Sequence, residues 1–371
     1  GSLVGAFSCC LMGGTYSGDI DDKGEVLTLR TPDGAAIGAT VDTGNLTPAN
    51  TQTEIAGLPN RSALVSIVAT ATAGPGYLQV LPCGAAPGAS SNLNTDAAGQ
   101  TRAALAVVQF DAAGKACIYN ETATHVIADL QGYFAPGAFD DTADVRLLDT
   151  RSGARRTAGT RTTITGLPNR SAVVSVTATQ TAGSGYLQVL ACDAAPGGSS
   201  NLNTDAAGQT RAVLAVVQFD AAGKACIYNE TATHVIADLQ GYFAPGAFDD
   251  TADVRLLDTR SGAAPASGSQ SSITGNAGRS ALVSISATGA TAGGYLQVLA
   301  CGTAAGASSN LNTDGAGQTI ANLAAVQFGA DGRACVFTSA STHIIADLQG
   351  YFVAGTFDDV ADARLVDTRT R

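Results

Sequence analysis

The stretch THVIADLQGYF, residues 124–134, followed after an acidic segment by RLLDTR, residues 146–151, decides the organisation of this chain. The same pair returns at residues 233–260 and, slightly altered, at residues 342–369. Each copy begins 109 residues after the one before it. A fixed period indicates an internal repeat, so three copies of one unit make up most of the 371 residues.

A period of 109 residues is much longer than the turn of a solenoid, which spans about 20–45 residues. It is an ordinary size for a domain with its own apolar core, so we expect independent domains like beads on a string. The first repeat opens on GATVDTG, with Asp42 and Thr43, a degenerate form of the RLLDTR strand. The predicted divisions are an N-terminal segment with an apolar start and one strand at 1–35, repeats at 36–138, 139–247 and 248–356, and a last, unpaired strand at 357–371.

Within the second repeat, β-branched or alternating segments are separated by turns that contain Gly, Pro or Asn. This pattern predicts an all-β chain with one antiparallel β-sandwich in each repeat. Residues 203–217 could instead form a helix capped by Asp205, but Gly208 and the valine pairs favour a strand. The expected strands are 144–151, 161–167, 171–181, 185–192, 210–220, 224–231 and 233–243, with a short eighth at 200–203.

Six of the eight cysteines fall in pairs 34 residues apart, at the same place in each repeat. One disulfide in each repeat is the simplest interpretation, joining the GYLQVL strand to the KACIY strand. A zinc site is the alternative, but no close pair of cysteines is followed by a second pair or by a histidine. Disulfides imply an oxidising space, so we expect a secreted, extracellular or cell-surface protein. The predicted pairs are Cys83 with Cys117, Cys192 with Cys226, and Cys301 with Cys335.

The composition argues against two classes of partner. The chain has 44 Gly, 20 Lys and Arg, and a formal net charge of −11. Nucleic acids and anionic membranes both need a basic face, so neither is expected as a partner. The longest apolar candidate, residues 2–14, is too short to span a membrane and lacks the charged start of a signal peptide, as in a processed chain.

The three histidines, His125, His234 and His343, are the obvious candidates for acid–base chemistry. Each begins the strand that ends in Gly-Tyr-Phe, and no nucleophile elbow, zinc-protease motif or phosphate loop accompanies it. A histidine hydrogen-bonded to a neighbouring loop is the better interpretation. We therefore expect no enzymatic activity and no catalytic residue, with a hydrolase as the distant alternative.

The RLLDTR motif combines two arginines with one aspartate. Asp149 can accept hydrogen bonds from turn amides, while Arg146 or Arg151 reaches a carboxylate of the acidic segment and fixes the angle between repeats. A surface Arg and Asp that bind a sugar or a carboxylate are the alternative. The predicted inter-repeat clamp consists of Arg146, Asp149 and Arg151 and their counterparts Arg255, Asp258 and Arg260.

Acidic turns separate the repeats, the first of them FDDTAD at residues 139–144. Calcium bound by such carboxylates stiffens extracellular linkers, although solvated turns are commoner. Asp140, Asp141 and Asp144 are therefore weak calcium candidates, and no other metal or cofactor is expected.

The segments GYLQVLPCG, APGASSNLNTDAAGQT, GKACIYNETATHVIADLQGYF and RLLDTR, in this order, resemble a tandem module of secreted and wall-associated proteins of actinobacteria and related bacteria. The resemblance covers about residue 36 to the end. It implies repeated β-sandwiches, export and a surface setting. In that family the modules occur beside or without a hydrolase, and no hydrolase motif stands beside them in this chain.

The two ends suggest self-assembly. Residues 2–12 would expose an apolar patch, and residues 357–371 carry a strand without a unit of its own. The apolar patch would be covered, and the strand would gain a partner, if this strand docked on the N-terminal region of the next chain. Such a contact generates an open fibre. Cys9 or Cys10 would then link neighbours or form a vicinal pair. The assembly strand is expected to act through Arg364, Leu365, Asp367 and Arg369.

The sequence thus predicts a non-enzymatic extracellular structural protein, the subunit of a cell-surface filament assembled head-to-tail from copies of itself. A surface adhesin or carbohydrate-binding repeat module is the alternative. Its partners would be cell-wall glycans, and Arg151 and Tyr133 would be the contacts to test.

Overall fold

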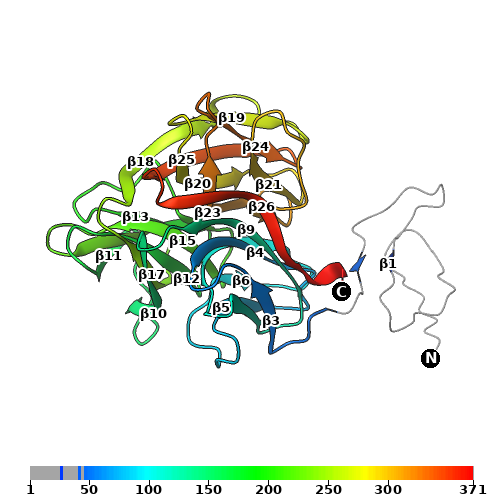
Figure 1. Cartoon of the computed structure of the whole chain (residues 1–371), viewed down its shortest axis with the longest axis horizontal. Helices are drawn as coiled ribbons and strands as arrows, with labels where there is room; N and C mark the ends of the chain where they lie inside the picture. Colours follow the sequence, from blue (N-terminus) through cyan, green and yellow to red (C-terminus); the bar gives the residue numbers. More distant parts are fainter. Residues whose placement is uncertain (1–25, 28–40, 43–45, 371) are drawn as a thin grey trace.

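The computed structural model describes residues 26–27, 41–42 and 46–370, and this part of the chain is all-β, as expected (Figure 1). Six antiparallel sheets have four strands each, and a separate two-residue pair joins β1 (Val26–Leu27) to β2 (Val41–Asp42). Among the described residues, the only helices are two 3-10 turns, η1 (Thr259–Ser261) and η2 (Thr368–Thr370).

Each repeat contributes two sheets with the same strand order; in the second repeat the orders are β10-β17-β12-β15 and β11-β16-β13-β14. The strands of the first repeat are β3 (Thr51–Ala56), β4 (Ser62–Thr70), β5 (Gly76–Leu81), β6 (Leu93–Thr95), β7 (Arg102–Gln109), β8 (Lys115–Asn120) and β9 (His125–Phe134). Those of the second are β10 (Phe139–Asp149), β11 (Thr160–Thr165), β12 (Ser171–Thr179), β13 (Gly185–Leu190), β14 (Leu202–Thr204), β15 (Arg211–Gln218), β16 (Lys224–Asn229) and β17 (His234–Phe243). Those of the third are β18 (Phe248–Asp258), β19 (Gln270–Thr274), β20 (Ser280–Thr288), β21 (Gly294–Leu299), β22 (Leu311–Thr313), β23 (Thr319–Gln327), β24 (Arg333–Thr338) and β25 (His343–Phe352), and β26 (Phe357–Asp367) follows.

Strand β15 occupies the stretch for which a helix was the alternative. Val213, Ala215 and Val217 lie in the core that the two sheets of the second repeat share. Leu214 and Val216, which alternate with them, lie in a second core at the centre of the molecule. The run is apolar without interruption because this strand is buried on both faces, a pattern that periodicity alone cannot distinguish from a buried helix.

A disulfide in each repeat ties the turn that follows β5, β13 or β21 to the strand β8, β16 or β24. All three predicted pairs are formed, each with a Cα–Cα distance of 4.9 Å: Cys83–Cys117, Cys192–Cys226 and Cys301–Cys335. The bonds close loops of 34 residues, which on a chain-entropy model stabilises each repeat by roughly 3–4 kcal/mol. They fit an oxidising, extracellular environment.

The C-terminal strand completes the first repeat. β26 pairs antiparallel with β9, and the sheet runs β26-β9-β4-β7. The prediction of an unpaired strand at 357–371 is therefore wrong for residues 357–367, which are hydrogen-bonded within the chain. The reason is that the first repeat lacks an opening strand of its own: the degenerate copy forms β2, which pairs with β1 instead.

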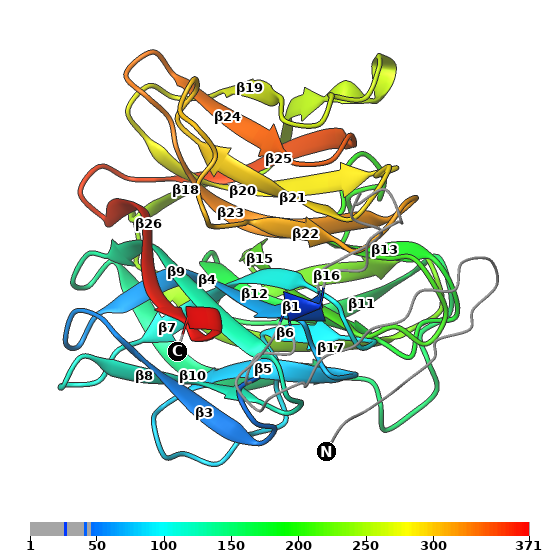
Figure 2. The same ribbon diagram turned by 90° about the vertical axis from the view of Figure 1, so that its right-hand side faces the viewer.

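The repeats also differ from the expected beads on a string. Figure 1 and Figure 2 show the sheets arranged in a ring around a common centre. One buried cluster there draws apolar side chains from all three repeats. Its rings form three stacked pairs, with centroids 4.1–4.2 Å apart: Phe134 with Phe139, Phe243 with Phe248, and Phe352 with Phe357.

The glycine of QGYF permits this packing. A Cβ atom built on Gly241 would overlap the ring of Phe139 and lie 2.7 Å from the carbonyl oxygen of Asp140. Gly132 has the same relation to Phe357. The opening strand of one repeat can therefore lie against the closing strand only because this position has no side chain.

Candidate functional site: the junctions between repeats

Arg146 lies where the first and second repeats meet. From β10 its Nε donates to Asp238 Oδ1 at 2.5 Å, and its Nη1 donates to Asp149 Oδ2. Its Nη2 donates to the carbonyl oxygen of Ala89, in the first repeat, at 2.8 Å. One guanidinium thus binds two carboxylates of its own repeat and the backbone of the preceding one.

The other two junctions repeat this arrangement. Arg255 binds Asp347 and Asp258 in the third repeat, and donates to the carbonyl oxygen of Gly198 in the second. At the junction between the third and first repeats the members are Arg364, Asp129, Asp367 and the carbonyl oxygen of Ala307, the last at 2.8 Å.

Arg151 and Asp149 form a fork within one repeat. The backbone N–H and the Nε of Arg151 both donate to Asp149 Oδ1 at 3.0 Å, and Nη2 donates to Oδ2 at 2.6 Å. These bonds from Arg151 hold the pKa of Asp149 down at about 2, against a smaller opposing effect of burial. Asp258 and Asp367 have lowered pKa values for the same reason. The predicted clamp residues therefore lie together, and Arg146 and Arg255 reach across the junctions. The predicted partner was wrong: Arg146 reaches a backbone carbonyl of the preceding repeat and not a carboxylate of the acidic segment.

The threonine of the DTR motif fastens the strand end. Thr150 Oγ1 accepts a hydrogen bond from the N–H of Val235 at 2.9 Å. His234 Nδ1 lies 3.0 Å from the carbonyl oxygen of Thr150, and the histidine is buried. The histidine thus contacts a neighbouring loop, as expected, rather than a second acid or base.

The acidic segment belongs to β10 and does not form a turn. Asp144 accepts hydrogen bonds from Ser90 of the first repeat and from Gln240 of the second. Asp141 accepts one from Ser62 of the first repeat at 2.7 Å. The register of β10 against β17 shifts between residues 141 and 145, so a β-bulge turns these carboxylates toward the junction.

The three weak calcium candidates bind different partners. Asp140 pairs with Arg170 at 2.9 Å, whereas Asp141 and Asp144 accept the hydrogen bonds described above. Within the described ranges of the chain, no group of three or more His, Cys, Asp or Glu side chains is placed to hold a metal ion. The geometry provides no support for calcium at these three weak candidates.

A second set of contacts between neighbouring repeats was not predicted from the sequence. Asp96 of the first repeat accepts from the N–H of Thr210 in the second at 2.8 Å, and its other oxygen lies 3.3 Å from Arg211 Nε. A search for recurring Asp and Arg would have found the positions in TDAAGQTR. The sequence could not show that the partners come from different repeats.

The aspartate–threonine contact occurs at all three junctions, but one junction lacks the arginine. Asp314 of the third repeat accepts from the N–H of Thr101 at 3.1 Å and pairs with the buried Arg102 of the first. Burial, then the nearby charge of Arg211, lowers the pKa of Arg102 to about 10. At the remaining junction Ile320 takes the place of the arginine.

Tyr133, an expected glycan contact, belongs to the core. It is buried, its hydroxyl accepts a hydrogen bond from the N–H of Leu58 at 3.1 Å, and the guanidinium of Arg61 lies 5.6 Å from the ring centroid. Arg151 instead lines a cavity of about 240 Å³ between the first and second repeats. A cavity of about 150 Å³ lies between the second and third repeats and is lined by Arg260.

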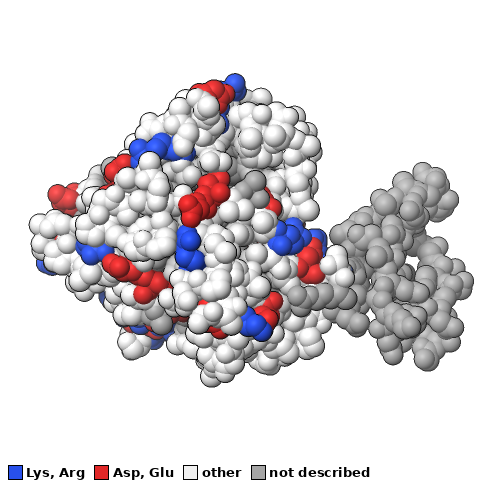
Figure 3. All heavy atoms as spheres, viewed as in Figure 1, with Lys and Arg blue, Asp and Glu red and all other residues white. Residues whose placement is uncertain are grey.

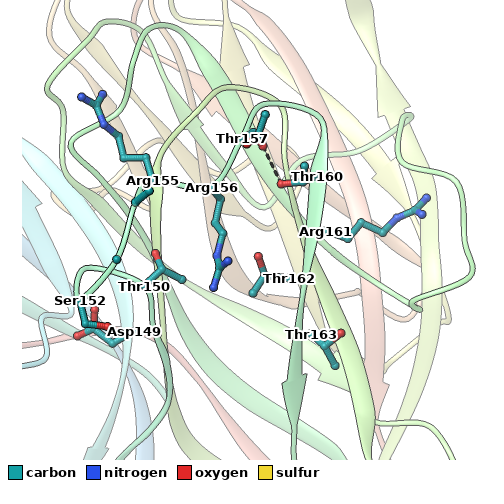
Figure 4. A pocket seen from close by; sticks show the side chains of 12 residues that line it. Asp149, Thr150, Ser152, Arg155, Arg156, Thr157, Thr160, Arg161, Thr162 and Thr163 are labelled. Carbon is teal, nitrogen blue, oxygen red and sulfur yellow. Dashed lines mark hydrogen bonds between the residues drawn. The ribbon is translucent and has the colours of Figure 1, made fainter.

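A larger cavity, of about 540 Å³, belongs to the second repeat alone (Figure 4). In Figure 4, Arg156 extends between Thr150 and Thr162, whereas Arg155 and Arg161 point away. Arg155 Nη1 donates to the carbonyl oxygen of Gln180 at 3.0 Å, and Arg161 Nη2 to that of Ala194 at 2.6 Å. The third repeat has Ala264 and Pro265 in place of Arg155 and Arg156, so this cavity does not recur there with the same chemistry.

The surface and the ends add two observations. On the face in Figure 3, acidic and basic side chains lie beside one another in small groups, and most of the surface is neither. The described residues include no helix of the length and hydropathy that a membrane span requires. Cys9 and Cys10, and the apolar start of the chain, lie outside the described residues.

No family model matches the chain, and no curated protein matches it. Among solved structures, the search returns a chain from the work "The Triple Jelly Roll Fold and Turret Assembly in an Archaeal Virus", with 12% identity, 89% of each chain covered and a TM-score of 0.24. A second comes from "Life in the extremes: atomic structure of Sulfolobus Turreted Icosahedral Virus", with 11% identity, 91% of each chain covered and a TM-score of 0.23. Similarities this weak carry no argument about the protein's role.

Proposed function

We propose that this protein is a non-enzymatic, extracellular structural protein whose three repeats, each a β-sandwich, act as one closed body that assembles head-to-tail. The observation that supports this most is the pairing of β26 with β9. Val366 lies opposite Ala128 there, as Leu148 lies opposite Ala237 in the second repeat. The first repeat thus accepts its opening strand from the far end of a chain.

That far end can belong to the same chain or to another copy. The contacts of β26 would be identical in both cases, so the two arrangements differ mainly in entropy. Tethering gives the intramolecular partner an effective concentration on the order of millimolar, which favours the closed ring in dilute solution. At the density of a cell surface, exchange of β26 between neighbours becomes competitive, and repeated exchange generates an open chain of rings.

Three features support a structural role over chemistry. Disulfides, fork-shaped ion pairs and a shared aromatic core all recur at corresponding positions of the repeats. His234 and His343 both contact the backbone carbonyl of a DTR threonine. Turnover of peptidoglycan or a wall polysaccharide that is abolished by His234→Ala would contradict the non-enzymatic role.

A cysteine pair tests the head-to-tail assembly. In a Cys9→Ser, Cys10→Ser background, Val366→Cys and Ala128→Cys place two thiols on facing residues of β26 and β9, within the reach of a disulfide. Oxidation of a dilute solution is expected to link each chain to itself. Oxidation at high concentration is expected to give a ladder of linked chains on a non-reducing gel.

The matched control is Leu148→Cys with Ala237→Cys in the same background, because β10 and β17 belong to the same repeat. This pair should link within one chain at every concentration. If the Val366→Cys, Ala128→Cys protein also gives only internally linked monomers at the highest concentration, head-to-tail assembly is ruled out while the closed ring stands.

A further inference from the structure

The two clefts between repeats are lined by corresponding residues. Every one of the eleven residues around the first cleft has its counterpart, 109 positions later, around the second. The first repeat supplies Tyr77, Ser91 and Asn94 to the first cleft, and the second repeat supplies Arg151 and Thr179. Neither cleft exists in a single repeat, so the packing of neighbouring repeats creates both.

Several polar groups in these clefts have no protein partner. Within the described part of the chain, neither the hydroxyl of Tyr77, nor Asn94 Nδ2, nor Arg151 Nη1 makes a hydrogen bond, although Asn94 Oδ1 accepts one from Ser91 at 2.9 Å. The same holds for the corresponding groups of the second cleft. Each cleft thus offers a fixed set of unused donors beside a half-buried aromatic ring.

The charged residues around the first cleft determine whether a charged or a neutral ligand fits there. Arg146 and Arg151 face Asp149 and Asp238 in close ion pairs, and Asp144 adds a carboxylate bound to Ser90, so no positive charge around the first cleft is left unpaired. A uronate, a phosphate or a sulfate would find no unpaired cation there. A ligand with hydroxyl groups and no charge satisfies the free donors without disturbing these pairs.

The tyrosine ring and the volume of each cleft also fit a sugar. Tyr77 is held against Tyr119, with centroids 5.8 Å apart and planes at 47°, and Tyr186 is held against Tyr228 at 5.7 Å in the same way. A fixed aromatic face suits the C–H face of a sugar ring. Cavities of about 150 and 240 Å³ are smaller than the roughly 300–1,000 Å³ of sites for drug-sized molecules, and suit one ring.

We propose that the clefts between repeats are binding sites for neutral pyranose sugars, one ring in each cleft. Two such sites on one rigid body bind a polysaccharide with far greater avidity than one site. This activity is separate from head-to-tail assembly, since no residue of β26 lines either cleft.

The full-length protein is tested by saturation-transfer NMR with glucose, galactose, mannose and N-acetylglucosamine, and on immobilised neutral polysaccharides. We expect saturation transfer to at least one of these sugars, and binding to a polysaccharide that contains it. The variant Tyr77→Ala with Tyr186→Ala should weaken binding at least ten-fold. Because the loss of a tyrosine can also loosen its hairpin, Asn94→Ala with Asn203→Ala provides a second variant, which is also expected to weaken binding.

The matched control is Arg156→Ala, which removes a guanidinium from the larger cavity of the second repeat and leaves both clefts intact. It should bind sugar like the unaltered protein. Three results would overturn the proposal: no binding of any neutral sugar, unchanged binding in both cleft variants, or a loss of binding confined to Arg156→Ala.

Discussion

Two kinds of aspartate in the junction strands respond to pH in opposite directions. Burial raises the pKa of Asp141 and of Asp359 to about 6, with smaller contributions from Asp144 and Asp362 respectively. In an unfolded chain an aspartate has a pKa of about 3.9. The folded protein therefore takes up protons at these two sites as the pH falls from about 7 toward 4, while the unfolded chain does not. Folding is favoured progressively over that range.

Asp149 behaves in the opposite way because its pKa, about 2, lies below the unfolded value. The stability it contributes is present above about pH 4 and is lost as the pH falls toward 2. We expect the free energy of unfolding, measured by denaturant titration, to be greatest between about pH 4 and 5. The variant Asp141→Asn with Asp359→Asn should flatten the rise between pH 7 and 5, by on the order of 1–2 kcal/mol for each carboxyl.

The exposed Asp193 offers a matched control for this pH effect, since Asp193→Asn removes a carboxyl away from the junctions. It should leave the shape of the pH profile unchanged. A double variant whose stability still rises from pH 7 to 5 as in the unaltered protein would show that other groups are responsible.

At the scale of elements, β26 is the piece on which the first repeat depends. Its Val366 is buried in the core of that repeat, and Thr368, just beyond it, accepts from the N–H of Val126 at 2.9 Å. Deletion of residues 357–371 should expose the edge of β9 and leave a cavity. We expect a loss of several kcal/mol of stability, because removal of one buried Val or Leu costs roughly 1–4 kcal/mol. Melting temperature and dye binding measure this loss.

A peptide of residues 357–371, added to the truncated chain, should restore its melting temperature, since β9 accepts the same strand from any source. The control peptide carries Val366→Asp, which would bury an unpaired carboxylate and should not bind. Failure of the unaltered peptide to bind at any concentration would contradict the idea that β26 can be exchanged.

The whole molecule should unfold as one body. Independent domains would give three overlapping transitions, with a calorimetric enthalpy about three times the van't Hoff enthalpy. The six phenylalanines of the central core come from all three repeats, so no repeat can unfold without exposing part of the others. We expect the ratio of these enthalpies to be near one. Phe243→Ala should lower the melting temperature of the entire molecule, and a fall confined to one third of the enthalpy would contradict the shared core.

The local structure of this protein could be predicted from short stretches of its sequence. Alternating and β-branched segments identified each strand of the second repeat, and the common spacing of Cys192 and Cys226 identified the disulfide, because these signals depend on neighbours within one unit. The clamp residues of RLLDTR were found for the same reason. Their partners were not, because Ala89 and Ser90 lie in the preceding repeat and contribute a backbone carbonyl and a hydroxyl, which leave no distinctive pattern.

By itself, the sequence determined the period, the all-β class, the strands and the cysteine pairs. Only the tertiary structure decided what happens to THVIADLQGYF and RLLDTR: the first ends on a phenylalanine of the central core, and the second ends a strand that lies at the junction between repeats. Three equal repeats can form a row or a ring with nearly the same local contacts. The choice depends on whether β26 can reach β9, a contact more than 220 residues apart along the chain that no local pattern encodes.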